Sequence, residues 1–274
     1  MNWRYLVERE GANGAWNMAA DEALWLELEE GRSDRPVLRL YGWTPPTFSL
    51  GHHQRPERAV DEDFCRSRGY GVVVRPTGGK VVLHNEEVTY CVAGLQEVPA
   101  FSGGLAATYT AIAAALAGSL QILGLPVTLE RRQRASSPKE LSPCFLVPTQ
   151  RELLVGGKKV VGSAQKRGRR AFLQHGSIPI RMDYEALALG TRNPLSSIPS
   201  YRSAFAGLGE FLPGLDREVL RDSLVRGFRA TFPGEWEQSR LTEDEKATAR
   251  VLARSREIPA SGRLLERNCH ESCL

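Results

Sequence analysis

A cysteine and a lysine flank one short strand-like stretch of this chain. Cys144 and Lys159 lie fifteen positions apart, and from the cysteine onward the sequence reads CFLVPTQRELLVGGKKVVGSAQKR. A thiol can hold an acyl group as a thioester, and a nearby ammonium can favour the thiolate and polarise the acyl carbonyl. The pair therefore predicts acyl-transfer chemistry.

A second chemically informative block, VRPTGGKVVLHNEE, covers residues 74–87. Its residues of interest are Arg75, Thr77, Gly78, Gly79 and His84. Adjacent glycines allow a tight turn and a close approach of backbone amides to a ligand, although a plain hairpin turn explains them equally well. A lone histidine is more often structural than catalytic. The block is neither a GxxxxGK[ST] nor a GxGxxG phosphate motif, so neither nucleotide signature is present.

Composition describes an ordinary globular chain of 274 residues, with 42% hydrophobic and 25% charged residues. No stretch approaches about 18 apolar residues and the N-terminus lacks a signal-peptide pattern, so we expect no membrane segment and a cytoplasmic location. The net charge of +4 is modest. It does not favour nucleic acid as a partner.

The five cysteines are an odd number with no repeated pair spacing, which argues against a disulfide framework and a four-ligand zinc site. The tail CHESCL holds Cys269, His270 and Cys273, which could bind a metal, but the sequence offers no second ligand pair and a frayed tail explains it better. We therefore expect no metal.

The pattern of apolar residues predicts an α+β fold. Strands are expected at residues 3–8, 36–42, 47–51, 71–75, 80–84, 88–93, 151–155, 158–164 and 171–180. Helices are expected from Asn13 or Asn17 to about Glu30, from Gly104 to Gly124, and near residues 216–231 and 241–255, with a turn at FPGEW. This gives a catalytic domain at residues 1–212 and a small helical segment with a flexible tail at 213–274.

Two polar stretches of the sequence have a possible role beyond that of a surface loop. Residues 130–143 lack any period and lead directly to Cys144, as a mobile lid would. Lys166, Arg167, Arg169 and Arg170 bracket Gly168 at an expected hairpin tip. A solvated turn explains this tip, and the alternative is a docking patch for an acidic protein.

Five ordered blocks make the chain resemble the lipoate–protein ligase and octanoyltransferase family. The blocks are NMAADEALW at 17–25, RLYGWTPPTFSLGHHQ at 39–54, VRPTGGKVVLHNEEVTY at 74–90, PCFLVPTQRELLVGGKKVVGSAQKR at 143–167 and FLQHGSIPI at 172–180. The resemblance implies the catalytic fold shared with biotin–protein ligases, a mixed or antiparallel sheet core flanked by helices.

Within this family, the context of Cys144 is similar to octanoyltransferases that act on the glycine cleavage H protein. The resemblance implies that Cys144 is the nucleophile and that Lys159 acts at the acyl carbonyl. The implied partners are octanoyl-acyl carrier protein and a lipoyl domain, which is that of H protein or of another protein. The expected enzyme is a monomer that uses no cofactor. Because thioester exchange is nearly balanced and amide formation is downhill, ATP is unnecessary.

The resemblance also implies an acyl pocket. Its substrate-binding residues would be Arg75, Thr77, Gly78, Gly79, His84, Gly162, Ser163 and Ala164. The chain departs from the family pattern at Lys80, where a third glycine is frequent, and at Asn85, where aspartate is frequent. Asn85 removes a charge that could orient His84.

Three alternatives remain open at this stage. The chain could be an ATP-dependent lipoate–protein ligase or an octanoyl amidotransferase between lipoyl domains. It could also be a non-catalytic protein that binds lipoyl domains or acyl carriers, with KRGRR as its docking surface. ATP dependence would identify the ligase, and a dispensable Cys144 would identify the binding protein.

Overall fold

A six-stranded mixed sheet forms the centre of the molecule. The computed structural model describes residues 1–130 and 152–256. The strand order is β10-β11-β6-β2-β1-β12, with antiparallel pairing from β10 to β2 and parallel pairing of β1 with both neighbours. The strands are β1 (Asn2–Ala12), β2 (Val37–Trp43), β6 (Glu87–Leu95), β10 (Gly162–Arg167), β11 (Ala171–Pro179) and β12 (Glu235–Gln238).

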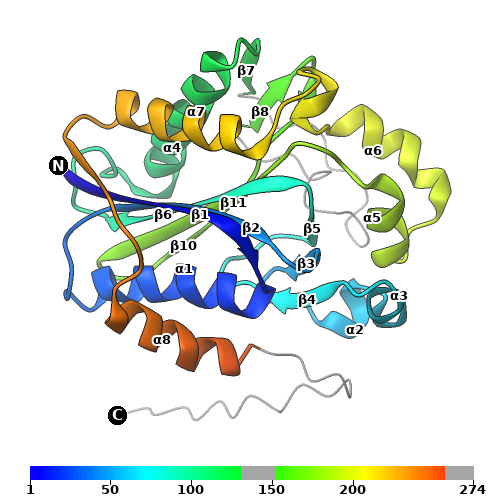
Figure 1. Cartoon of the computed structure of the whole chain (residues 1–274), viewed down its shortest axis with the longest axis horizontal. Helices are drawn as coiled ribbons and strands as arrows, with labels where there is room; N and C mark the ends of the chain where they lie inside the picture. The colour runs from blue at the N-terminus through cyan, green and yellow to red at the C-terminus, as the bar shows by residue number, and fades with distance from the viewer. Residues whose placement is uncertain (131–151, 257–274) are drawn as a thin grey trace.

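Two pairs of helices cover the two faces of this sheet (Figure 1). On one face lie α1 (Gly14–Glu29) and α8 (Glu243–Arg254), and on the other lie α4 (Gly104–Ile122) and α7 (Arg217–Thr231). Every residue of β2, β6 and β11 is buried, as expected for strands covered on both faces. The expected α+β class, with a mixed sheet flanked by helices, is confirmed.

Two smaller three-stranded sheets adjoin the main one. The first contains β3 (Thr47–Leu50), β4 (Gly71–Val74) and β5 (Val82–His84), and the second contains β7 (Val127–Glu130), β8 (Glu152–Val155) and β9 (Lys158–Lys159). Short helices pack around the β3 sheet: α2 (Pro56–Ala59), α3 (Glu62–Ser67), α5 (Tyr184–Gly190) and α6 (Ile198–Ala204). The turns at Leu195–Ser197 and Leu208–Glu210 are 3₁₀ helices.

Helix boundaries follow local capping chemistry. The Asn13 side chain accepts a hydrogen bond from the Trp16 amide, so α1 starts at the first of the two candidate asparagines. The second, Asn17, is buried inside α1, where its amide donates to the carbonyl of Gly42. Gly124 has a φ of +79° just beyond α4, which explains where that helix stops.

The predicted strand at residues 158–164 is wrong as a single element. The structure divides it into β9, which pairs with β8, and β10, which pairs with β11 in the main sheet. Val160 and Val161 join the two strands and are both buried. A continuous apolar run fits a buried strand, and it fits a buried crossing between sheets just as well.

The residues after position 213 were expected to be helical, and that expectation missed a strand. β12 begins inside the FPGEW stretch read as a turn, and it pairs in parallel with the start of β1, from Asn2↔Glu235 to Tyr5↔Gln238. Trp236 stacks on Trp3 with ring centroids 4.5 Å apart. This part of the chain therefore extends the main sheet, while α7 and α8 cover its two faces.

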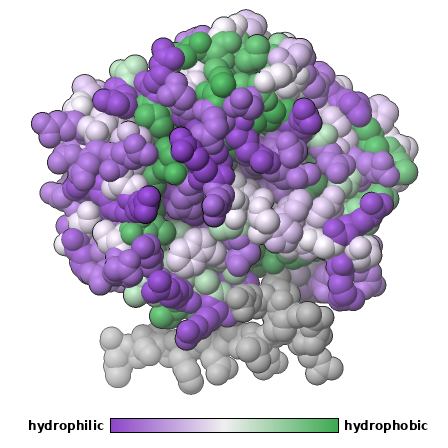
Figure 2. Space-filling model, in the orientation of Figure 1, coloured by the Kyte–Doolittle hydropathy of each residue, from purple (hydrophilic) through white to green (hydrophobic). Residues whose placement is uncertain are grey.

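One helix of the described residues, α4, is long and apolar enough to cross a membrane by length and composition, although the sequence analysis found no such stretch. In the fold it packs against α7, and its buried residues, including Ile112, Leu116 and Leu120, belong to the core between α7 and the main sheet. Figure 2 shows a largely hydrophilic face, with hydrophobic residues gathered mainly toward its upper rim. Core packing explains the composition of α4.

Candidate active site

Five of the residues expected to bind substrate surround one buried cavity. The cavity lies between α1, the main sheet and the β3 sheet, and its volume of about 30 Å³ corresponds to about two water molecules. The five are Arg75, His84, Gly162, Ser163 and Ala164. The rest of the lining is Met18, Tyr41, Trp43, Ser49, Val82, Thr89, His175, Gly176 and Ser177. Two blocks nearly 80 residues apart, around His84 and around Ser163, thus face each other.

Thr77, Gly78 and Gly79 form the turn beside this cavity and are not among its lining residues. Arg75 holds the turn closed, because its guanidinium donates hydrogen bonds to the carbonyls of Gly78, at 2.9 Å, and Lys80, at 2.7 Å. Gly79 has a φ of +104°, a conformation that side chains other than glycine rarely adopt. A Cβ atom at Gly78 would meet no atom within 4 Å, so a ligand can approach the backbone there.

Lys159 is buried and is not among the residues that line this cavity. Its ammonium donates to Glu152 Oε1 at 2.6 Å, and its side chain is only 5% exposed. Lys159 and Glu152 line a second, smaller cavity of about 10 Å³, and Ser163 lines both cavities. Ser163 is thus the residue that the two linings share. Cys144 and residues 131–143 of the expected lid lie outside the described residues.

A serine, a histidine and a glutamate form a hydrogen-bonded series along the cavity. Ser49 Oγ lies 2.7 Å from His84 Nε2, and His84 Nδ1 lies 2.8 Å from Glu87 Oε1. All three side chains are buried, and the Trp43 ring stacks on His84 with centroids 4.0 Å apart. Because Asn85 stands where aspartate is frequent, His84 was expected to lack a charge that orients its ring, and this expectation was wrong. The carboxylate of Glu87, two positions after Asn85, orients the ring instead.

The second histidine of the cavity repeats this arrangement. His175 Nδ1 lies 3.0 Å from Asp21 Oδ2, and His175 Nε2 lies 2.7 Å from Thr77 Oγ1 in the glycine turn. Asp21 is fully buried, and it also accepts from Arg39, at 2.7 Å, and from the Tyr41 hydroxyl, at 2.7 Å. The series joins α1, β11 and the turn, so it fixes the turn against the main sheet.

Buried carboxylates keep their charge in both series. Burial raises the pKa of Asp21, but the His175 hydrogen bond and the Arg39 charge outweigh it, so this pKa is lowered. The pKa of Glu87 is lowered in the same way: burial raises it, but His84 and two hydroxyl groups outweigh burial and bring it below its usual value. Burial lowers the pKa of His175, and Asp21 offsets this only in part. His175 is therefore neutral near pH 7.

Four residues of these two series were not predicted from the sequence: Asp21, Ser49, Glu87 and His175. Each of them lies inside one of the blocks that carry the family resemblance. A charged residue in the otherwise apolar stretch NMAADEALW and a histidine in the buried strand FLQHGSIPI were the available signals. Charged and polar groups in such positions need partners, which points to a buried network.

The two described cysteines are poor nucleophiles. Cys65 and Cys91 are both buried free thiols. Burial, followed by Asp61 and Glu62, raises the pKa of Cys65 to about 12. Burial also raises the pKa of Cys91 well above its usual value. Within residues 1–130 and 152–256, no cluster of three or more His, Cys, Asp or Glu side chains could hold a metal ion.

The basic hairpin tip is largely engaged within the molecule. Lys166 donates to Glu22 at 2.9 Å, and Arg167 donates to Gln96 and Thr108. Only Arg169 and Arg170 of the four basic residues are exposed. The docking patch expected from KRGRR thus reduces to two exposed arginines.

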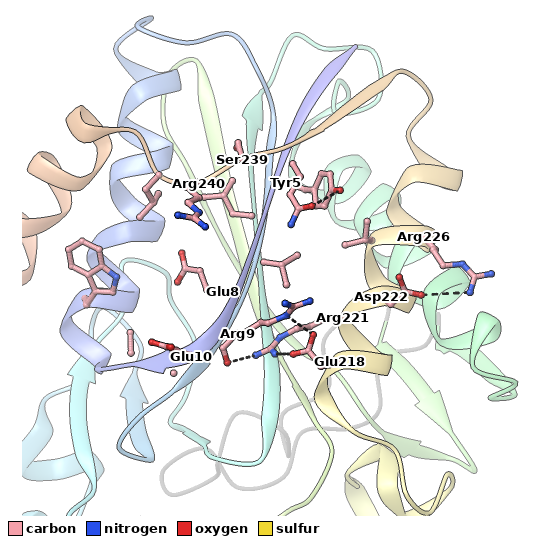
Figure 3. A pocket seen from close by; sticks show the side chains of 18 of the residues that line it. Tyr5, Glu8, Arg9, Glu10, Glu218, Arg221, Asp222, Arg226, Ser239 and Arg240 are labelled. Atoms are coloured by element: carbon pink, nitrogen blue, oxygen red, sulfur yellow. Dashed lines mark hydrogen bonds and ion pairs between the residues drawn. The ribbon is translucent and has the colours of Figure 1, made fainter.

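A much larger hollow of the described surface lies elsewhere, along the outer edge of β1 (Figure 3). It has a volume of about 1200 Å³ and lies beyond the point where β12 stops pairing with β1. Charged side chains dominate it, and Arg9 and Arg221 both bond Glu218 there. None of the expected site residues lines this groove. Charges along a strand edge are a common protection against edge pairing, so we place the active site at the smaller cavity.

Comparison with known proteins finds similar sequences over most of the chain. The model of the lipoyl protein ligase A/B catalytic domain matches residues 13–229. A protein of Kyrpidia tusciae named octanoyltransferase LipM is 39% identical over 261 residues, which cover 91% of this chain and 94% of that protein.

Solved structures with the same fold include two lipoate–protein ligases. A crystal structure of lipoate–protein ligase A bound with ATP matches with a TM-score of 0.77 and 25% identity, over 93% of this chain and 95% of that one. A bipartite lipoate protein ligase from Thermoplasma acidophilum, studied with its E2 lipoyl domain, matches with a TM-score of 0.75 and 25% identity, over 93% of this chain and 92% of that one.

Proposed function

Because the chain belongs to the lipoyl protein ligase A/B catalytic domain family, we propose that it is an octanoyltransferase of lipoate biosynthesis. Its donor is octanoyl-acyl carrier protein, and its acceptor is a lysine of a lipoyl domain such as the glycine cleavage H protein. The supporting observation is that residues from two separate sequence blocks enclose one buried cavity beside a buried lysine.

In the first half-reaction, the Cys144 thiolate attacks the octanoyl thioester. The new C–S bond forms on Cys144, and the carrier thiolate leaves with the electron pair of the broken C–S bond. The Lys159 ammonium stabilises the developing oxyanion. Since Cys65 and Cys91 are buried thiols of raised pKa, neither competes for this role.

In the second half-reaction, the amine of the target lysine attacks the acyl-enzyme. A thioester becomes an amide, which is downhill, so the transfer needs no ATP. The octanoyl chain enters between Trp43 and Ala164, where the cavity of about 30 Å³ must widen to hold it. Each buried methylene contributes about 0.8 kcal/mol before the costs of association.

The test uses intact mass spectrometry. Purified protein is mixed with octanoyl-acyl carrier protein in the absence of ATP, and a mass increase of one octanoyl group is expected. Cys144→Ser should not form the thioester, and Cys65→Ser serves as the matched control that should still be acylated. An unmodified wild-type protein would refute the proposal.

Three other functions give different results in this assay. An ATP-dependent ligase would need ATP and a free acid, as the ATP-bound structural relative suggests. An amidotransferase would take octanoyl only from an octanoylated lipoyl domain. A binding protein would form no acyl-enzyme at all.

We further propose that the enzyme is a cytoplasmic monomer.

A further inference from the structure

The second half-reaction requires a proton acceptor that the proposed pair does not supply. An unperturbed lysine has a pKa of about 10.4, so the target amine arrives as an ammonium and must lose a proton before it can attack. Lys159 is itself an amine, and it donates to Glu152. The cavity, in contrast, contains two buried imidazoles.

We propose that Ser49, His84 and Glu87 form the proton relay for attack by the target lysine. The proposal rests on the proposed function. The target ammonium first passes one proton to Ser49 Oγ, whose own proton moves to His84 Nε2; as the N–C bond then forms and the C–S bond breaks, the second nitrogen proton is released to solvent. The electron pair of the C–S bond stays on Cys144, which leaves as the thiolate. His84 then releases its proton to solvent, and the cycle can restart.

Hydrogen-bond chemistry defines the direction of the relay. Glu87 already accepts bonds from Ser177, at 2.6 Å, and from Thr89, and a carboxylate can only accept. His84 Nδ1 must therefore carry a proton and donate to Glu87 at 2.8 Å. In the neutral ring Nε2 is then an acceptor, and it takes the Ser49 hydroxyl at 2.7 Å.

Charge distinguishes His84 from His175 as the acceptor. Asp21, the partner of His175, also contacts Arg39, so much of its charge is already compensated. Within the described part of the chain, Glu87 contacts His84 and two hydroxyl groups but no lysine or arginine. An imidazolium at His84 would thus lie beside an uncompensated carboxylate, which stabilises it.

Other charged groups also face this histidine. The Arg75 guanidinium donates to Ser49 Oγ at 3.2 Å, opposing a positive charge on His84 but stabilising negative charge on the serine oxygen. His175 lines the same cavity and is neutral. Glu87 therefore acts as a positioning residue, and Ser49 and His84 carry the proton.

The experiment separates the two half-reactions. Acyl-enzyme prepared from octanoyl-acyl carrier protein is isolated and mixed with either a lipoyl domain or hydroxylamine, which is already unprotonated at neutral pH. For His84→Gln, the acyl-enzyme that forms should react with the lipoyl domain about 10²–10⁴ times more slowly than the wild-type acyl-enzyme does. Hydroxylamine should discharge the variant acyl-enzyme within a few-fold of the wild-type rate.

Matched variants keep the test decisive. Glu87→Gln should show the same split between the two amines with a smaller loss, because the amide can still accept a hydrogen bond but carries no charge. His175→Gln breaks the parallel series, and both amines should slow by the same factor.

Two outcomes would overturn the relay: equal loss with both amines in His84→Gln, or an unchanged rate with the lipoyl domain. Failure of wild type to form any acyl-enzyme would instead reject the proposed function, so the two failures are distinguishable.

Discussion

The buried carboxylate of Asp21 gives the most direct test of how the site is held together. Asp21 and Arg39 are both fully buried, with 2.7 Å between Oδ1 and Nη1. Arg39 also contacts Glu8 at 2.8 Å, and Glu8 is 28% exposed. The guanidinium therefore has one buried and one partly hydrated carboxylate partner.

Substitution Asp21→Asn removes the buried charge and keeps the side-chain shape. Breaking a buried ion pair from one side costs about 3–5 kcal/mol. Because Glu8 remains in contact with Arg39, we expect about 3 kcal/mol, the lower end of this range. The control Glu8→Gln should cost about 1 kcal/mol or less, since its carboxylate is partly exposed.

Urea denaturation measures both values as changes in the free energy of unfolding at constant slope. A double variant, Asp21→Asn with Arg39→Met, should be more stable than the sum of the single losses predicts, because it removes both charges together. The reasoning is refuted if Asp21→Asn loses less than about 1 kcal/mol, or if Glu8→Gln loses as much as Asp21→Asn.

Three further predictions follow from the geometry. Lys159→Ala should slow acylation of Cys144 by roughly 10²–10³, as for loss of one oxyanion donor, and a normal burst in stopped-flow assays would reject its role. Gly79→Ala should destabilise the protein by about 1–2 kcal/mol in thermal unfolding, because its φ of +104° disfavours a Cβ, and an unchanged midpoint would contradict this. The lowered pKa of His175 means that the unfolded chain takes up a proton first. Stability should therefore fall as pH drops below about 6.5, and this slope should flatten in His175→Gln.

The main architecture could be predicted from patterns local in sequence. The stretches around β2, β6 and β11 are apolar and bounded by turn residues, so their strand character is visible without a structure. The helix at Gly104–Ile122 is rich in alanine and ends before a glycine and a proline, which is an equally local signal. Such elements depend little on what packs against them.

Elements that depend on distant partners could not be predicted. β12 has four residues, of which three are exposed, and its strand conformation comes from pairing with β1 at the other end of the chain. The division between β9 and β10 likewise depends on two different neighbouring strands. Neither pairing leaves a periodic signal in the residues themselves.

The residues of the site also divide into those that could be predicted from the sequence and those that could not. Arg75, His84 and Ser163 could be proposed because each lies in a recognisable block, and the structure brings these blocks to one cavity. The partners Glu87 and Asp21 were missed, since a carboxylate becomes informative only when its burial is known. Asn85 is adjacent to His84 in sequence and led to a wrong expectation, because the residue that holds the imidazole ring is Glu87, three positions after His84.

Pairing of the first strand with the last has a consequence for how the chain folds during synthesis. Tyr5 and Gln238 are separated by 233 positions, and β12 completes the edge of the main sheet beside β1. On the ribosome, the start of β1 emerges 233 positions ahead of its outer neighbour β12. Long-range pairings of this kind slow folding and leave a strand edge open to other chains. We therefore expect nascent chains that end before β12 to bind chaperones at the Asn2–Tyr5 edge until synthesis passes residue 238.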